Sequence, residues 1–232
     1  MPVSRRIILG VGGAVVVAGG ATALWLSQNP GPAPVAPASN PAGGASLLPT
    51  GDAKLAERAI GRADAPVVVH EFFSMTCPHC AAFHKESMPQ IHKNLVETGK
   101  IRMIFHDFPL DKLALTASVI ARYLPADRYE PFCAALLGAQ ERWIYPPAGS
   151  NTAAELWKFA ALAGLSRTAF DAALADQTTA NALLAMQDRD AKSYQVDSTP
   201  TFIFSGKALA NHKDAGAKSY DEFAKLVATA GG

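Results

Sequence analysis

The sequence predicts an α/β protein in which a block of helices interrupts a sheet. Three observations support this prediction. Residues 67–73 form a β-branched and aromatic run that is typical of a buried strand. A helical pattern over 81–98 and a second strand over 100–108 follow, and this order implies a right-handed parallel unit. Strand signals then return only at 199–204, after a long helical pattern.

The chain has 232 residues and divides into five predicted segments. Residues 1–28 form a signal peptide or membrane anchor, and 29–52 form a linker rich in Pro, Ala and Gly that cannot build a core. Residues 53–110 supply the first part of the sheet domain, 111–194 form an inserted all-helical domain, and 195–232 complete the sheet domain.

The first segment has the pattern of an export signal. Arg5 and Arg6 precede an apolar run over 7–26, and Ser-Arg-Arg-x-x-Leu resembles a twin-arginine signal. As a helix this run is about 30 Å long, enough to cross a bilayer. Because good cleavage sites are lacking, a retained anchor remains an alternative to a cleaved signal. Either places the domain in the periplasm or at the inner membrane, where disulfides persist.

Finer expectations follow from spacing and turn residues. Pro89 should kink or divide the helix that it interrupts. Asn151 or Thr152 should cap a helix, with Glu155 completing a capping box. We also expect an edge strand at 57–61, helices at 111–124, 128–140, 152–163, 167–175, 179–194 and 219–229, and a hairpin partner for the late strand at 207–210.

The chemistry centres on Cys77 and Cys80, which lie where a strand turns into a helix. A thiol at a helix N-terminus faces unpaired amides and the positive end of the helix dipole, and both favour the thiolate. An imidazolium at His79 would lower the pKa of Cys77 further, and Pro78 suits the first helical position. Only the reduced state holds this thiolate, so the pair should give its disulfide away readily. Cys80 suits the resolving role.

Other uses of a C-x-x-C pair fit less well. Zinc needs four ligands, and the one further cysteine, Cys133, has no ligand pair around it. A c-type haem needs His directly after Cys80, where Ala81 stands. We therefore expect no metal and no cofactor beyond the redox-active cysteine pair. Cys133 lies in an apolar helical stretch and is expected to be an inert buried thiol, with a regulatory thiol as the alternative.

Three stretches carry a resemblance to a known family. They are Glu71-Phe-Phe-Ser, Cys77-Pro-His-Cys80 and Ser198-Thr-Pro-Thr-Phe202. Together they resemble the DsbA-type thiol:disulfide oxidoreductases, which implies a thioredoxin-like fold with an inserted all-helical domain. The stretches 83–86 and 107–111 look like the single-domain bacterial branch. The likeness runs from about residue 53 to the C-terminus, and the anchor and linker lie outside it.

The resemblance implies roles for particular residues. Cys77 is the nucleophile whose disulfide accepts substrate electrons, Cys80 is its resolving partner, and Pro78 and His79 tune the reduction potential. Glu71 matches an acidic residue beneath the site that relays the proton of Cys80. The alternative for Glu71 is a partly solvated strand carboxylate.

Two further positions concern the binding of substrate and the surroundings of the site. Pro200 matches the family's cis-proline, which exposes the backbone of Thr199 so that a substrate strand can pair there. His84, one turn beyond Cys80, could face the site, but we expect a surface histidine. The remaining histidines form no ligand spacing; they are His70, His92, His106 and His212.

Function and partners follow from the pair and the resemblance. We expect a periplasmic thiol:disulfide oxidoreductase that donates its disulfide to exported proteins with free thiols, and a DsbB-like, quinone-linked membrane partner that reoxidises it. The alternatives are an isomerase or reductase on the same fold and, further off, a metal- or peptide-binding module. Thioredoxin-type reductases usually carry Trp where Thr76 stands. The net charge of +1 without a basic block argues against nucleic acid.

Overall fold

A computed structural model describes residues 51–232 of the chain. The predictions for residues 1–50, which include the signal or anchor segment and nearly all of the linker, lie outside the described residues. Within 51–232, no helix is both long enough and apolar enough to cross a membrane. The described part begins with the short helix α1, Gly51–Leu55.

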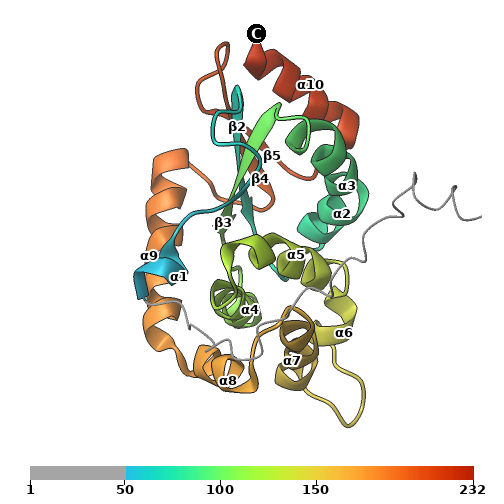
Figure 1. Cartoon of the computed structure of the whole chain (residues 1–232), viewed down its shortest axis with the longest axis vertical. Coiled ribbons are helices and arrows are strands. Elements are labelled where there is room, and N and C mark those ends of the chain that lie inside the picture. Colours follow the sequence, from blue (N-terminus) through green and yellow to red (C-terminus); the bar gives the residue numbers. More distant parts are fainter. Residues whose placement is uncertain (1–50) are drawn as a thin grey trace, which may run out of the picture. The chain divides into compact units, whose positions relative to one another are not determined.

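The sheet has five strands in the order β1-β3-β2-β4-β5. The strands are β1 Arg58–Ile60, β2 Val67–Phe73, β3 Ile101–Asp107, β4 Thr201–Ser205 and β5 His212–Ala215. Only β2 and β3 pair in parallel, and the other three pairs are antiparallel. The predicted parallel unit and the edge strand are therefore both present. Figure 1 shows α9 along one side of the sheet and α2, α3 and α10 on the other.

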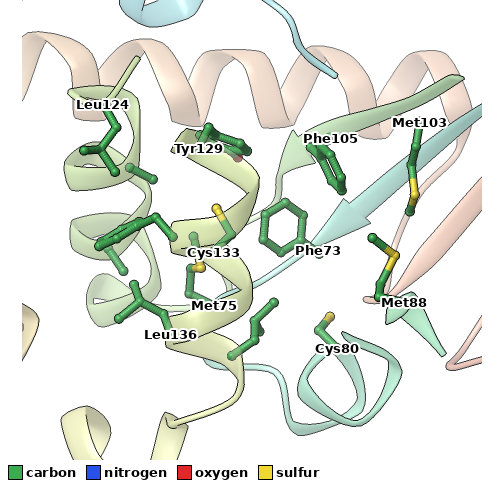
Figure 2. Packing of buried hydrophobic residues seen from close by; sticks show 14 of the residues in the cluster. Phe73, Met75, Cys80, Met88, Met103, Phe105, Leu124, Tyr129, Cys133 and Leu136 are labelled. Carbon is green, nitrogen blue, oxygen red and sulfur yellow. The ribbon is translucent and has the colours of Figure 1, made fainter. Parts of the chain in front are cut away.

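One face of the central strand β2 is fully buried and the other is buried or half-buried, which explains its nearly unbroken apolar run. Val69, Glu71 and Phe73 point toward the main core, which also contains Met103 and Phe105 of β3 (Figure 2). The alternate residue Phe72 points to the reverse face and packs in a second cluster with Phe108, Val196 and Ile203. Since side chains alternate along a strand, this register sets Glu71 on the same side of the sheet as α2.

The first long helical segment is divided, as the proline predicted. It consists of α2 Pro78–Glu86, α3 Met88–Ile91 and the π-helical turn η1 His92–Val96. The break falls at Ser87, before Pro89. A proline has no N–H to donate to the carbonyl four residues earlier, and its ring crowds that carbonyl, so the regular helix ends before it.

Between β3 and β4 the chain is helical. The helices are α4 Lys112–Arg122, α5 Ala126–Leu137, α6 Gln140–Ile144, α7 Thr152–Leu162, α8 Arg167–Ala175 and α9 Gln177–Tyr194. The predicted helix over 128–140 runs past the end of α5, and the sequence pattern did not predict α6 beyond its first residue. Asn151 caps α7 by accepting a hydrogen bond from the Ala154 amide. The predicted Thr152–Glu155 capping box was wrong, because the Glu155 carboxylate instead accepts from Ser150 and Lys158.

The hairpin partner at 207–210 was also wrong. Those residues form the loop, in which the Gly206 amide donates to the Leu209 carbonyl, and β5 begins only at His212. Asn211 turns the chain into β5 with φ of 51°, a left-handed conformation that Asn tolerates better than most residues. The final helix, α10 Tyr220–Gly231, starts with a capping box between Ser219 and Glu222.

A buried ion pair ties the helical insertion to the sheet. Arg122 Nε of α4 donates to Asp107 Oδ2 of β3 at 2.7 Å, and the two side chains are 1% and 2% exposed. Tyr129 Oη of α5 donates to the other carboxylate oxygen at 2.9 Å. Arg122 Nη1 also donates to the Ala56 carbonyl at 2.7 Å, just before β1. Because both charges are buried, removing one member leaves the other without its counter-charge.

We therefore expect Asp107→Ala to destabilise the protein by about 3–5 kcal/mol, because Arg122 would stay buried without its carboxylate. Urea unfolding of the full chain measures this loss. Asp64→Ala is the matched control, since Asp64 pairs with Arg62 on the surface, where both side chains are 70% exposed, and it should leave the stability nearly unchanged. Similar losses in both variants would show that the buried pair does not hold the insertion.

Candidate active site

The first cysteine is the N-cap residue of α2. Cys77 has extended backbone angles, φ −76° and ψ 120°, and Pro78 follows at the start of the helix. The Cys77 amide donates to the Ser74 carbonyl at 3.1 Å, and the Cys77 carbonyl accepts from the Ala81 amide at 3.1 Å. This geometry places the Cys77 sulfur at the end of α2 where unpaired amides gather.

Both cysteines are reduced in the structure, with no disulfide bond between them. Their surroundings shift their pKa values in opposite directions. A hydrogen bond from the Cys80 thiol is the main cause that lowers the pKa of Cys77, from 9.0 to about 5. Burial opposes this shift, and the backbone amides of Cys80 and His79 add to it. At neutral pH Cys77 is therefore a thiolate.

Cys80 has the reverse character. Its side chain is completely buried, and burial is the largest cause that raises its pKa far above the ordinary value. The hydrogen bond with Cys77 and the negative charge of Glu71 raise the pKa further. Figure 2 shows Cys80 at the start of α2 among buried core residues. Cys80 is therefore the protonated, protected member of the pair.

The loop before β4 lies directly against Cys77. The Thr199–Pro200 peptide bond is cis, and the Cys77 sulfur lies 3.3 Å from the Thr199 carbonyl oxygen, to which its protonated form can donate. The Pro200 carbonyl accepts from the Gly216 amide at 2.8 Å, which fastens the loop to the far end of β5. Pro78 and His79, by contrast, are exposed beside the cysteine pair. The structure thus places the predicted residues around the Cys77 sulfur close together, namely Pro78, His79, Thr199 and Pro200.

Glu71 and His84 lie beneath the pair and contact each other. Glu71 is completely buried, which rules out a partly solvated carboxylate. His84 was expected on the surface, and this was wrong, because its side chain is 2% exposed and its Nε2 lies 2.9 Å from Glu71 Oε1. Burial lowers the pKa of His84, but the charges of Glu71 and Glu130 and the hydrogen bond with Glu71 together raise it more, so the net shift is upward. The sequence held one signal for this position: Cys80 and His84 are four residues apart, and residues at that spacing lie on the same face of a helix.

Two residues that sequence reasoning missed hold the loop in front of Cys77. Gln140 Nε2 of α6 donates to the carbonyls of Met75 and Cys77 at 2.8 and 3.0 Å. Asp111 Oδ2 accepts from Thr76 Oγ1 at 2.6 Å. The helical insertion therefore positions the cysteine loop. No local pattern marks Gln140, because its partners lie more than sixty residues away in the sequence.

The remaining candidate residues lie apart from the dithiol. Cys133 is 1% exposed, and burial raises its pKa well above the ordinary value, as expected for an inert thiol. On the reverse face of the sheet, His70 Nδ1 lies 2.9 Å from His106 Nε2, and His106 Nδ1 lies 2.8 Å from Asp190 Oδ2. Among residues 51–232 no group of three or more His, Cys, Asp or Glu side chains is arranged to hold a metal ion.

Fold and site together define a thioredoxin-fold protein with a redox dithiol, and comparison with known proteins agrees. The family model described as Thioredoxin matches residues 54–228, so the chain belongs to this family. The crystal structure of alpha-DsbA1 from Wolbachia pipientis is similar, with a TM-score of 0.68 and 26% identity over 80% of this chain and 94% of that one. The predicted thioredoxin-like fold with a helical insertion and the resemblance to DsbA-type proteins are confirmed.

Two curated proteins are similar in sequence. A Rickettsia typhi protein, whose name describes a protein-disulfide oxidoreductase, is 29% identical over 158 residues, which are 67% of this chain. The chain spans only 57% of that relative's length. Disulfide bond formation protein D of Bacillus subtilis is 23% identical over 176 residues, 72% of this chain and 74% of that protein.

The effect of the Cys80 thiol on the pKa of Cys77 can be tested. We expect Cys80→Ala to raise the pKa of Cys77 by at least about one unit toward the free-cysteine value near 8.5, because the donor is lost. Cys80→Ser keeps a donor in the same place and should leave the pKa near that of the unmodified chain. The thiolate absorbance of the full chain against pH measures both. An unchanged pKa in the alanine variant would assign the shift to the helix amides alone.

Proposed function

We propose that this chain is a protein disulfide oxidoreductase that donates its Cys77–Cys80 disulfide to exported proteins during oxidative folding. The observation that carries the proposal is the opposite ionisation of the two cysteines, one a thiolate at the helix end and one a buried thiol. The similarity to proteins named for disulfide oxidation and disulfide bond formation supports it. The match covers little more than half of the Rickettsia relative, so the geometry of the site is the stronger support for this activity.

The exchange proceeds in two balanced steps. A substrate thiolate attacks the Cys77 sulfur, so that a mixed disulfide forms and the Cys77–Cys80 bond breaks. Cys80 leaves as a thiolate and takes up a proton. A second substrate thiolate then attacks the substrate sulfur of the mixed disulfide and releases Cys77 as a thiolate. The substrate is oxidised by two electrons, and the cysteine pair is reduced to the dithiol.

The low pKa of Cys77 influences both the rate and the direction of disulfide transfer to the substrate. A thiol with a low pKa is a better leaving group, so the mixed disulfide is resolved quickly in favour of the substrate disulfide. The thiolate exists only after the disulfide has been broken, and its stabilisation therefore favours the reduced protein. Both effects suit a donor of disulfides.

The rim of the site suits an extended polypeptide. The backbone of Thr199, held by the cis-Pro200 bond beside the Cys77 sulfur, would pair with a substrate strand. Pro78 and His79 are exposed on the other side of the sulfur and would meet the same substrate. Glu71 would exchange a proton with Cys80, whose pKa already responds to the Glu71 charge.

Location and partners follow from the same reaction. Disulfides accumulate outside the cytoplasm, and the basic and apolar start of the sequence supports export or anchoring through residues 7–26. The substrates would be unfolded exported proteins with free thiols. A membrane partner of the DsbB kind, linked to quinone, would take the electrons from the dithiol and restore the disulfide.

An isomerase is the second candidate. A similar structure from Novosphingobium aromaticivorans is titled a protein-disulfide isomerase, with a TM-score of 0.58 and 26% identity over 73% of this chain. An isomerase must remain bound through a mixed disulfide long enough to rearrange its substrate. A low pKa at Cys77 shortens that stage, because it makes Cys77 a good leaving group.

Ribonuclease as substrate separates the two functions. We expect the oxidised full chain to form disulfides rapidly in reduced, unfolded ribonuclease and to reactivate scrambled ribonuclease poorly. Thiol quantification measures the first reaction and recovered ribonuclease activity the second. Cys77→Ala should abolish oxidation, because the nucleophile is gone. Cys133→Ala, which removes only the inert buried thiol, should retain it. Strong reactivation with weak oxidation would instead establish an isomerase.

A further inference from the structure

The side-chain amide of Gln140 holds two backbone carbonyls of the loop that carries Cys77. Its Nε2 donates to the Met75 carbonyl at 2.8 Å and to the Cys77 carbonyl at 3.0 Å. A primary amide has two N–H groups, so both are used here. No other group among residues 51–232 donates to the Met75 carbonyl. Gln140 therefore fixes the backbone on both sides of Thr76.

The sequence of the cysteine loop explains why the Met75 carbonyl takes a donor from so far away. In a continuing turn the amide three residues on would donate to this carbonyl, but that residue is Pro78, which has no N–H. Met75 is completely buried, and a buried carbonyl without a donor destabilises the fold. The proline at the start of α2 thus leaves an acceptor unpaired, and the helical insertion supplies its partner.

The short helix α6 keeps the amide of Gln140 in place. Trp143 of this helix is completely buried, and its Nε1 donates to the Leu136 carbonyl of α5 at 2.9 Å. Arg142 of the same helix pairs with the buried Glu155 of α7 at 3.2 Å. Because α6 is fastened to α5 and α7, Gln140 can hold the cysteine loop instead of moving with it.

The two hydrogen bonds act on the Cys77 sulfur through the direction of the Cys77 backbone. Cys77 is the N-cap residue of α2, with ψ of 120°, and its carbonyl also accepts from the Ala81 amide. In this conformation the amides of His79 and Cys80 favour the Cys77 thiolate. Hydrogen bonds weaken steeply with distance and angle, so a loop free to rotate about Cys77 would lose these contacts.

We propose that Gln140 is a positioning residue for disulfide transfer, which holds the Cys77 sulfur at the N-terminal end of α2 and so sets how readily the pair releases its disulfide. The proposal deepens the proposed function and rests on it. Gln140 acts through the backbone of Cys77. The helical insertion thereby contributes to the reaction, although both cysteines lie outside it.

A positioning role predicts an effect that depends on the redox state. The Cys77 sulfur is an anion only in the dithiol, so the amides of α2 stabilise the dithiol and not the disulfide. Loosening the loop therefore destabilises the dithiol more than the disulfide, and it shifts the equilibrium with glutathione toward the oxidised protein. A side chain that only supported the fold would affect both forms equally and leave that equilibrium unchanged.

Gln140→Met tests the proposal in the full chain, because methionine fills a similar volume and has no N–H to donate. We expect the pKa of Cys77 to rise by at least about half a unit, and the equilibrium constant for reduction by glutathione to fall at least about threefold. Thiolate absorbance against pH measures the pKa. Equilibration with glutathione buffers at pH 7 measures the equilibrium constant.

Two further variants serve as comparisons. Gln187→Met is the matched control, since Gln187 lies on α9 of the same insertion and donates to the Pro109 carbonyl at 3.3 Å, outside the cysteine loop. It should leave both values unchanged. Thr76→Val removes the hydrogen bond from Thr76 Oγ1 to Asp111 but leaves both carbonyls paired with Gln140. It should change both values less than Gln140→Met does.

Gln140→Asn gives a second test if Gln140→Met does not fold. Its amide is one methylene group closer to the backbone and no longer reaches both carbonyls, so both values should shift in the same direction as with methionine. Urea unfolding gives an independent measure. Each Gln140 variant should lose more stability in the dithiol form than in the disulfide form.

The outcomes are distinct. Unchanged values in the Gln140 variants, equal losses of stability in the two redox forms, or an equally large effect of Thr76→Val would overturn the role of Gln140 and leave the proposed function intact. Failure of the unmodified chain to oxidise reduced ribonuclease would overturn the proposed function itself, whereas the equilibrium with glutathione would still report on Gln140.

Discussion

The effect that the side chains of Cys77 and Cys80 have on each other's ionisation is the interaction on which the site depends. It needs one sulfur at the open end of α2 and the other a turn further in, where it is completely buried. This interaction is the largest cause that lowers the pKa of Cys77, and it adds to burial in raising the pKa of Cys80. This one interaction therefore makes Cys77 the nucleophile and Cys80 the buried, protonated cysteine. The interaction is lost when the disulfide forms.

The rest of the fold maintains this separation. Strand β2 ends just before the start of α2 and places the buried Glu71 beneath Cys80. The cis-Pro200 loop closes the front of the Cys77 sulfur. Helix α6 of the insertion fastens the cysteine loop through Gln140, and the buried Arg122–Asp107 pair fastens the insertion to the sheet. The helical block is thus a support for the site and not only an addition to the sheet domain.

Sequence reasoning recovered what local patterns encode. The apolar run of β2, the cysteine pair at the helix start and most helices were predicted closely, because periodicity and turn residues act over short distances. Residues whose partners are distant were missed or misjudged. Gln140 has no local signal, and His84 looks like a surface residue until Glu71 is placed beside it. The hairpin partner was misplaced because the loop at 206–209 is closed by its own hydrogen bond, which composition does not reveal.

The most direct test of the account is the reduction potential of the full chain, measured at equilibrium against glutathione buffers at pH 7. A stabilised Cys77 thiolate favours the dithiol, so we expect a potential less negative than about −180 mV, on the oxidising side of protein disulfide isomerase and toward that of DsbA. A value near that of thioredoxin, at about −270 mV or below, would contradict it. The thiolate would then not drive the release of the disulfide.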